Sequence, residues 1–290
     1  MSNSRSVGGA SAARERINQE GNASDPLDKL AASTVSGLDT LGKIAIFGFG
    51  MFADLPFVVR HYFSEAIRQA GILVVSSSVV LWVFTLTIGL EAALLAHYIL
   101  GNVGAQDYAG MFIAFAVMQA TSASTFGWIF AAKVGCGYAA ELGTMRITEE
   151  VDALRVMGMH PRAYLAGTRL LACLLAVPFI FVVTLTMMLA GGWVMAVQIL
   201  GTTSSGGFLD VLWTFMTPLD VLLALVWSMA TVVAIVVVSC YFGYNASGGP
   251  VGVGTNTARS MALNLIVASA FTGLFYQVFF GMNVAFPIAN

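Results

Sequence analysis

Leu170–Leu200 reads LLACLLAVPFIFVVTLTMMLAGGWVMAVQIL, a run without a single charged residue. About 20 apolar residues are enough for a helix to cross the hydrocarbon core of a bilayer. Four other uncharged runs reach that length: Ala70–Leu90, Tyr108–Ala132, Val221–Phe242 and Met261–Phe286. The sequence therefore predicts an all-α integral membrane protein with five transmembrane helices.

The overall composition agrees with a membrane protein. Of 290 residues, 58% are hydrophobic and only 10% are charged, whereas soluble domains carry about 25% charged residues. The net charge of −2 argues against nucleic-acid binding. We expect no disulfide, metal site or cofactor, because the residues that could form one are scattered: Cys136, Cys173, Cys240, His61, His97 and His160.

The chain before the first run divides into two parts. Residues 1–43 are rich in Ser, Asn, Gly and Ala without apolar periodicity, which predicts a disordered cytoplasmic tail. Residues 44–69 are interrupted by Asp54, Pro56 and several charges, so their apolar part is too short to cross. We expect an interfacial helix at the cytoplasmic face, leading into a transmembrane domain over residues 70–290. The alternative is a sixth crossing that turns at Asp54–Pro56.

The positive charges predict the orientation. Lys and Arg gather on the cytoplasmic side of membrane proteins. The thirteen Lys and Arg residues all fall before the first run, between the second and third, or between the fourth and fifth. The loops Glu91–Asp107 and Gly201–Asp220 contain none, and neither does the tail after Phe286. A multi-pass inner (plasma) membrane protein with a cytoplasmic N-terminus and an external C-terminus follows.

A polar segment, Glu141–Arg169, separates the second and third runs on the predicted cytoplasmic side. It contains features of a short capped helix: Thr148 as N-cap, acidic residues in the first turn, and Gly158 as terminator before a proline. Ile147, Val151 and Leu154 form one apolar stripe at helical spacing. The pattern fits a loop that packs on its own membrane domain, or a rigid peg that docks into a soluble partner.

The same segment carries a family resemblance. Its sequence, AELGTMRITEEVDALRVMGMHPRAYLAGTR from Ala140, resembles the central motif of the MlaE/YrbE permeases, the membrane subunits of ABC transporters that work with Mce-type lipid-binding proteins. The similarity extends over about residues 45–286, and the Ser/Asn-rich extension resembles the actinobacterial YrbE branch. Thr168 departs from the family, which often has proline before the final arginine. The matching residues are Ala140, Glu141, Leu142, Gly143, Met145, Glu150, Asp152, Ala153, Leu154, Gly158, Pro161, Tyr164, Leu165 and Arg169.

The resemblance implies a mechanical role for this segment. Residues Glu149–Met157 correspond to the coupling helix that sits in a groove of an ABC ATPase dimer. The resemblance also implies a second, paralogous YrbE permease, Mce lipid-binding proteins and a lipid substrate as partners. The residues expected to couple to the ATPase are Glu141, Arg146, Glu149, Glu150, Asp152, Leu154 and Arg155.

The chain shows no nucleotide site or catalytic arrangement of its own. The stretch Gly37–Lys43 fits GxxxxGK, but Ile44 stands where a P-loop has the Ser or Thr that binds magnesium. No apolar strand precedes it, so we interpret the match as chance. The protein is therefore not expected to be an enzyme, and its energy must come from a partner or a gradient.

Glu91 is the acid closest to the membrane interior, because it follows an apolar run directly. If the first helix continues beyond it, Glu91 could line an outward-facing substrate cavity. If the helix ends near Leu90, Glu91 lies in the outer interface.

The leading hypothesis is the permease subunit of a Mce-type ABC transporter that moves lipids or other hydrophobic molecules. The alternatives are a gradient-driven secondary transporter or a non-transporting scaffold for cell-envelope proteins. Secondary transporters usually contain internal repeats and mid-membrane charges, and five spans offer no clean inverted repeat. ATP-dependent lipid movement would separate the first hypothesis from the other two.

Overall fold

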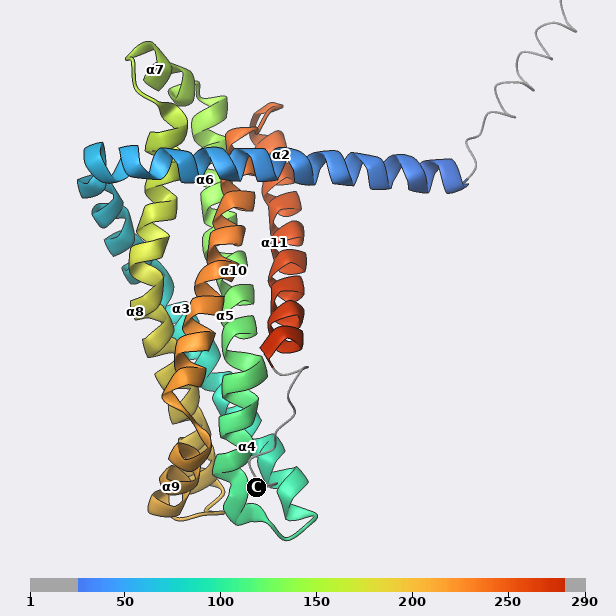
Figure 1. Ribbon diagram of the computed structural model, residues 1–290, viewed down its shortest axis with the longest axis vertical. Helices are drawn as coiled ribbons and strands as arrows, with labels where there is room; N and C mark the ends of the chain where they lie inside the picture. Colours follow the sequence, from blue (N-terminus) through green and yellow to red (C-terminus); the bar gives the residue numbers. More distant parts are fainter. Residues whose placement is uncertain (1–25, 280–290) are drawn as a thin grey trace, which may run out of the picture. The chain divides into compact units, whose positions relative to one another are not determined.

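The computed structural model describes residues 26–279 as an all-helical chain (Figure 1). It divides into two compact units, residues 1–46 and 47–290. Helix α2 (Pro26–His61) begins in the first unit and ends in the second. The disordered tail was predicted to extend to residue 43, but the chain is helical from Pro26 onward. In that stretch Lys43 pairs with Asp39 one turn earlier at 2.6 Å, an interaction that favours helix. Residues 1–25 of the predicted tail lie outside the described residues.

The remaining helices of residues 26–279 follow in sequence order, with one short 3₁₀ segment (η1) and four π-helical segments (η2 to η5) between them. They are α3 (Phe63–Gly101), η1 (Gln106–Tyr108), α4 (Ala109–Phe115), η2 (Ala116–Thr121), α5 (Ser122–Phe130), η3 (Ala131–Gly135), α6 (Cys136–Ile147), α7 (Glu150–Val156), η4 (Ala163–Gly167), α8 (Thr168–Trp193), η5 (Val194–Ile199), α9 (Ser205–Phe215), α10 (Pro218–Tyr244) and α11 (Gly249–Phe279). Within the second unit, α7 lies at one end of the bundle, whereas α4 and α9 lie at the other (Figure 1).

The predicted number of five possible spans is confirmed for the described residues, although the set differs. The helices long and apolar enough to cross a membrane are Asp39–His61, Phe63–Gly101, Ala163–Ile199, Pro218–Tyr244 and Gly249–Val278. The end of α2 is thus included. The predicted span Tyr108–Ala132 is instead divided among α4, η2, α5 and η3, which follow one another without a break into α6.

The predicted interfacial segment 44–69 consists of two helices rather than one. Helix α2 ends at His61, and α3 begins at Phe63 after the single residue Tyr62. Pro56 lies inside α2 without ending it. The location of α2 at a membrane face remains a prediction.

Helices α3 and α8 pack closely because two glycines remove side chains from their contact. A Cβ added at Gly89 would meet the backbone carbonyl oxygen of Met188, and one added at Gly191 would meet that of Leu86. Small residues allow membrane helices to approach in this way. Helix α3 continues to Gly101, beyond Leu90, the predicted end of the first span. Glu91 therefore lies within this helix and not at its end.

Helices α10 and α11 begin with clear start signals. Thr217 and Asp220 form a reciprocal capping box at α10, and Pro218 occupies its first turn. Helix α11 begins at Gly249, well before the predicted span Met261–Phe286. Pro250 is compatible with this first turn because the amide hydrogen it lacks would have no helical partner there. The end of the predicted span, residues 280–286, lies outside the described residues.

Candidate coupling site

Helix α7 lies between α6 and α8 at one end of the bundle. Its C-terminal end has the left-handed geometry that the sequence predicted: Gly158 has φ +76°. The amide of Met159 donates to the Leu154 carbonyl at 3.1 Å, and that of Gly158 donates to the Arg155 carbonyl at 3.1 Å. These two bonds form a Schellman motif, which ends the helix sharply.

The N-terminal end of α7 differs from the prediction. Thr148 is not its N-cap but follows the last residue of α6, where its hydroxyl lies within hydrogen-bonding distance of two acceptors, the Thr144 carbonyl oxygen at 3.0 Å and Glu150 Oε1 at 2.9 Å. Glu149 is the N-cap and has φ +62°, without a side-chain capping bond. Only two residues separate the helices, so the chain must reverse within them, and Glu149 takes the left-handed conformation.

The charged residues of this segment brace it internally. Asp152 accepts hydrogen bonds from Arg146 at 2.9 Å and from Arg155 at 3.4 Å. Asp152 therefore links the end of α6 to α7. Arg146 and Asp152, expected from the sequence to face a partner, are brought together and contact each other.

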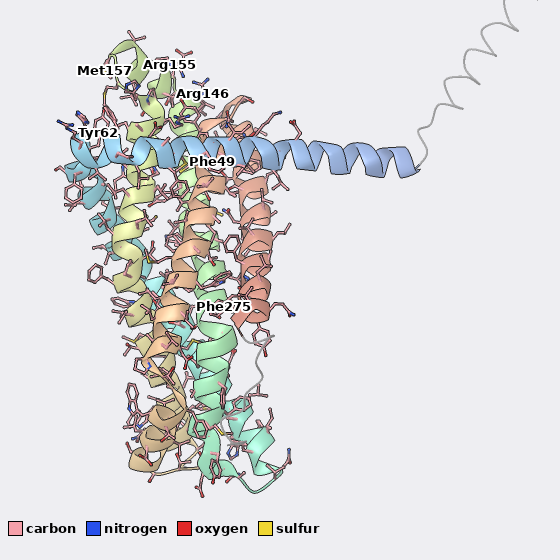
Figure 2. All side chains as sticks on the ribbon, viewed as in Figure 1. Phe49, Tyr62, Arg146, Arg155, Met157 and Phe275 are labelled. Atoms are coloured by element: carbon pink, nitrogen blue, oxygen red, sulfur yellow. The ribbon has the colours of Figure 1, made fainter. Side chains whose placement is uncertain are left out.

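The apolar residues divide into an inward and an outward group. Val151 is fully buried, and Ile147 and Leu154 are partly buried, so the predicted stripe packs mainly on its own chain. The exposed apolar side chains are Val156, at 88% exposure, and Met157, at 66%. Figure 2 shows Met157 and Arg155 at the α7 end of the molecule. The sequence pattern did not identify Val156 and Met157, because they do not belong to the apolar stripe at helical spacing. Their position directly before Gly158, which ends the helix, could have identified them.

An ion pair fixes the chain that returns from α7. The Arg162 guanidinium donates to both carboxylate oxygens of Asp54 in α2, at 2.7 and 3.2 Å. Bidentate geometry of this kind sets orientation as well as distance. The hydrogen bond to Asp54 raises the pKa of Arg162. A Cβ at Gly50 would meet the same guanidinium, so glycine makes room for the pair.

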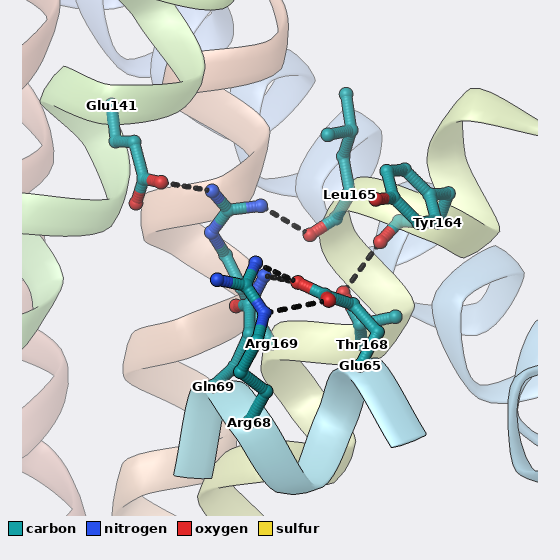
Figure 3. Close-up of polar contacts among 8 residues, drawn as sticks. All are labelled: Glu65, Arg68, Gln69, Glu141, Tyr164, Leu165, Thr168 and Arg169. Carbon is teal, nitrogen blue, oxygen red and sulfur yellow. Dashed lines mark hydrogen bonds and ion pairs between the residues drawn. The ribbon is translucent and has the colours of Figure 1, made fainter. Parts of the chain in front are cut away.

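A second ion pair lies at the base of the segment (Figure 3). Arg169 of α8 is 1% exposed and contacts Glu141 of α6 at 2.9 Å. Its guanidinium also donates to the Leu165 carbonyl at 2.6 Å and lies 5.6 Å from the centre of the Tyr138 ring. Glu141 is thus a structural anchor at the base of the segment, rather than part of α7 itself.

This pair gives an asymmetric stability prediction. We expect Glu141→Gln to lower the free energy of unfolding by about 2 kcal/mol, because the buried guanidinium of Arg169 loses its charged hydrogen-bond partner. Arg169→Met should cost less, because Glu141, whose side chain is 52% exposed, can be hydrated instead. Chemical denaturation in detergent micelles measures both variants. The double variant should be more stable than Glu141→Gln alone; a double variant that is less stable would contradict the role of the pair.

The other candidate residues from the sequence do not form a site together. Glu91 lies within α3 and is exposed, and it lines neither of two cavities that border α3. Within residues 26–279, no group of His, Cys, Asp and Glu side chains could hold a metal ion. The three cysteines are free thiols, of which Cys173 and Cys240 are buried.

Comparison with known proteins identifies the family. The sequence model described as "Permease MlaE" matches residues 66–282, which is most of the chain. The chain belongs to the MlaE permease family. A probable ABC transporter permease protein of Rickettsia bellii is 28% identical over 257 residues, which cover 87% of this chain and 98% of the relative.

Two other relatives of this MlaE-family permease carry more specific names. The intermembrane phospholipid transport system permease protein MlaE of Haemophilus influenzae is 22% identical over 260 residues, covering 88% of this chain and 97% of the relative. The chloroplastic protein TRIGALACTOSYLDIACYLGLYCEROL 1 of Arabidopsis thaliana is 33% identical over 138 residues, covering 48% and 39%. The resemblance of the polar segment to this family is confirmed.

Proposed function

We propose that this chain is the permease subunit of a Mce-type ABC transporter that moves lipids or other hydrophobic molecules across the inner membrane. A separate ATPase dimer drives it, and α7 is the coupling helix that docks into the ATPase. A second, paralogous permease and Mce lipid-binding proteins complete the complex. The N-terminus and α7 face the cytoplasm, and the C-terminus faces outward.

The observation that carries the proposal is the pair of exposed apolar side chains at the end of α7. Val156 and Met157 project where the bundle offers no surface to cover them, so they are available to a partner. The internal bracing by Asp152 supports the same role, because a helix that transmits force must move as one body. The name of the Haemophilus relative supports a lipid as the substrate.

Reconstitution tests the proposal. The complex of this permease with its ATPase and second permease is placed in proteoliposomes that contain a fluorescent phospholipid. We expect lipid movement that requires ATP hydrolysis and persists when ionophores collapse ion gradients. An ATPase subunit unable to hydrolyse ATP is the control. Movement that ionophores abolish and ATP leaves unchanged would show a gradient-driven transporter, and a complex without movement under either condition would support a scaffold.

A further inference from the structure

The segment that returns from α7 to α8 is attached to α2 as well as to its own chain. Within it, the Arg162 guanidinium donates to both carboxylate oxygens of Asp54 in α2, at 2.7 and 3.2 Å. The two residues are 108 positions apart, so the ion pair joins two separate elements. A bidentate pair fixes the angle between its partners as well as their distance.

Close packing without intervening side chains holds the same two elements together. Val58 of α2 is fully buried in a cluster with Ala163 of η4 and Leu171 of α8. A Cβ added at Gly167 would meet the Val58 side chain, and one added at Gly50 would meet the Arg162 guanidinium. The end of α2 therefore fits against the returning segment by shape as well as by charge.

Two edge-to-face ring contacts extend this surface along the returning segment. Phe57 meets His160 with ring centres 5.4 Å apart, and Tyr62, which follows α2, meets Tyr164 at 5.2 Å. Ring pairs of this geometry attract each other. Figure 2 shows Tyr62 toward the same end of the molecule as Met157 of the α7 segment. We call these contacts the α2 joint; it consists of Asp54, Phe57, Val58 and Tyr62 on one side and His160, Arg162, Ala163, Tyr164 and Gly167 on the other.

Helix α7 has two connections to the rest of the bundle. One runs back through α6, to which Asp152 is held by Arg146. The other runs forward through the returning segment, and this one leads to the α2 joint. Helix α2 in turn is followed by α3 after the single residue Tyr62. A displacement of α7 that travels along the returning segment must therefore carry the end of α2 with it, as long as the joint holds.

We infer that Asp54 and Arg162 are positioning residues for lipid movement: they lock α2 to the segment that returns from α7, so that both move as one body when the ATPase closes. The pair stays closed throughout the cycle, because the ring contacts and the space at Gly50 and Gly167 give α2 one position against this segment. The inference rests on the proposed function, in which α7 contacts the ATPase.

The exposure of the pair indicates that its main role is geometric. The side chains of Arg162 and Asp54 are 43% and 25% exposed. Ion pairs that water reaches contribute little to stability, whereas the Arg169 side chain of the pair with Glu141 is 1% exposed. Loss of the Asp54–Arg162 pair should therefore leave the permease folded and change how motion is transmitted through it.

Variants of the pair should separate ATP hydrolysis from lipid movement in the reconstituted complex. Asp54→Asn and Arg162→Gln should each lower the number of lipids moved per ATP hydrolysed by about tenfold, since coupling between two sites commonly corresponds to about 5- to 150-fold. ATPase binding, ATP hydrolysis and the denaturation midpoint should be retained. Arg162→Lys should also lower the ratio, because lysine keeps the charge without the bidentate geometry.

The matched control removes another ion pair of α2. Lys43 pairs with Asp39 of the same helix, so this pair joins no second element. Lys43→Gln should leave the number of lipids moved per ATP unchanged.

A reversible cross-link can replace the ion pair. Asp54→Cys/Arg162→Cys is made together with Cys136→Ser, and the remaining cysteines, Cys173 and Cys240, are buried. The reduced protein should move few lipids per ATP. A short reagent with two methanethiosulfonate groups should restore the ratio, and dithiothreitol should reverse the restoration. A reagent with one such group should have no effect, because it forms no link.

Three outcomes would overturn the inference and leave the proposed function standing. An unchanged ratio in Asp54→Asn and Arg162→Gln would show that the pair transmits no motion. Lipid movement that the cross-link blocks would show that the pair opens during the cycle. A denaturation midpoint lowered as far as that of Glu141→Gln would show a role in folding alone. If the unaltered complex bound no ATPase or moved no lipid with ATP, the proposed function would fail, and the inference with it.

Discussion

The double variant Val156→Asp/Met157→Asp should weaken binding of the ATPase by about a thousandfold, because two central apolar contacts of an interface contribute about 2 kcal/mol each. Both side chains are largely exposed in the isolated chain, so the substitutions leave its own packing intact. The folded permease should elute unchanged from size exclusion without the ATPase. Co-purification of the ATPase and a dissociation constant measured by titration into nanodiscs give the result.

A matched control distinguishes docking from general damage. Val103, between α3 and η1, is 72% exposed and lies in a loop predicted to face the other side of the membrane. Val103→Asp should leave ATPase binding unchanged. Asp152→Lys is a poorer test, because Asp152 braces Arg146 and Arg155, and its loss would disturb α7 itself. Unchanged ATPase binding by the double variant would refute α7 as the coupling helix.

Gly89→Ala and Gly191→Ala should each lower the free energy of unfolding by about 3 kcal/mol, the upper part of the usual range for overpacking. In each case the new Cβ would meet a backbone carbonyl oxygen of the opposite helix, and a backbone atom cannot move aside as a flexible side chain can. Helices α3 and α8 would therefore have to separate along their contact. Chemical denaturation of the purified permease in detergent micelles measures the loss.

Gly71→Ala provides the control on the same helix. A Cβ at Gly71 has no other atom within 4 Å, so alanine should be neutral or stabilise α3 by up to about 1 kcal/mol through its higher helix propensity. If Gly89→Ala were as stable as Gly71→Ala, the helices would not approach as closely as the structure indicates. The same comparison applied to ATP-dependent lipid movement would show whether this contact also matters for transport.

The sequence predicted the features that depend on local composition. Long uncharged runs such as Leu170–Leu200 predicted membrane-spanning helices, because an apolar helix of that length has a lower free energy in hydrocarbon than in water. Gly158 predicted the end of α7, since a left-handed residue there favours glycine. Thr148 failed as a predicted N-cap because it is the C-cap of α6, and Glu149 stands between it and the first residue of α7.

What the sequence by itself determined is the all-helical membrane character, the family and the position of the polar segment. Only the tertiary structure decided which side chains of that segment are exposed and which are buried. Val151 and Val156 are both valines of α7, yet one is buried and the other is 88% exposed. Arg169 is buried against Glu141, a residue far from it in sequence. Burial depends on which helices surround a side chain, and local composition does not contain that information.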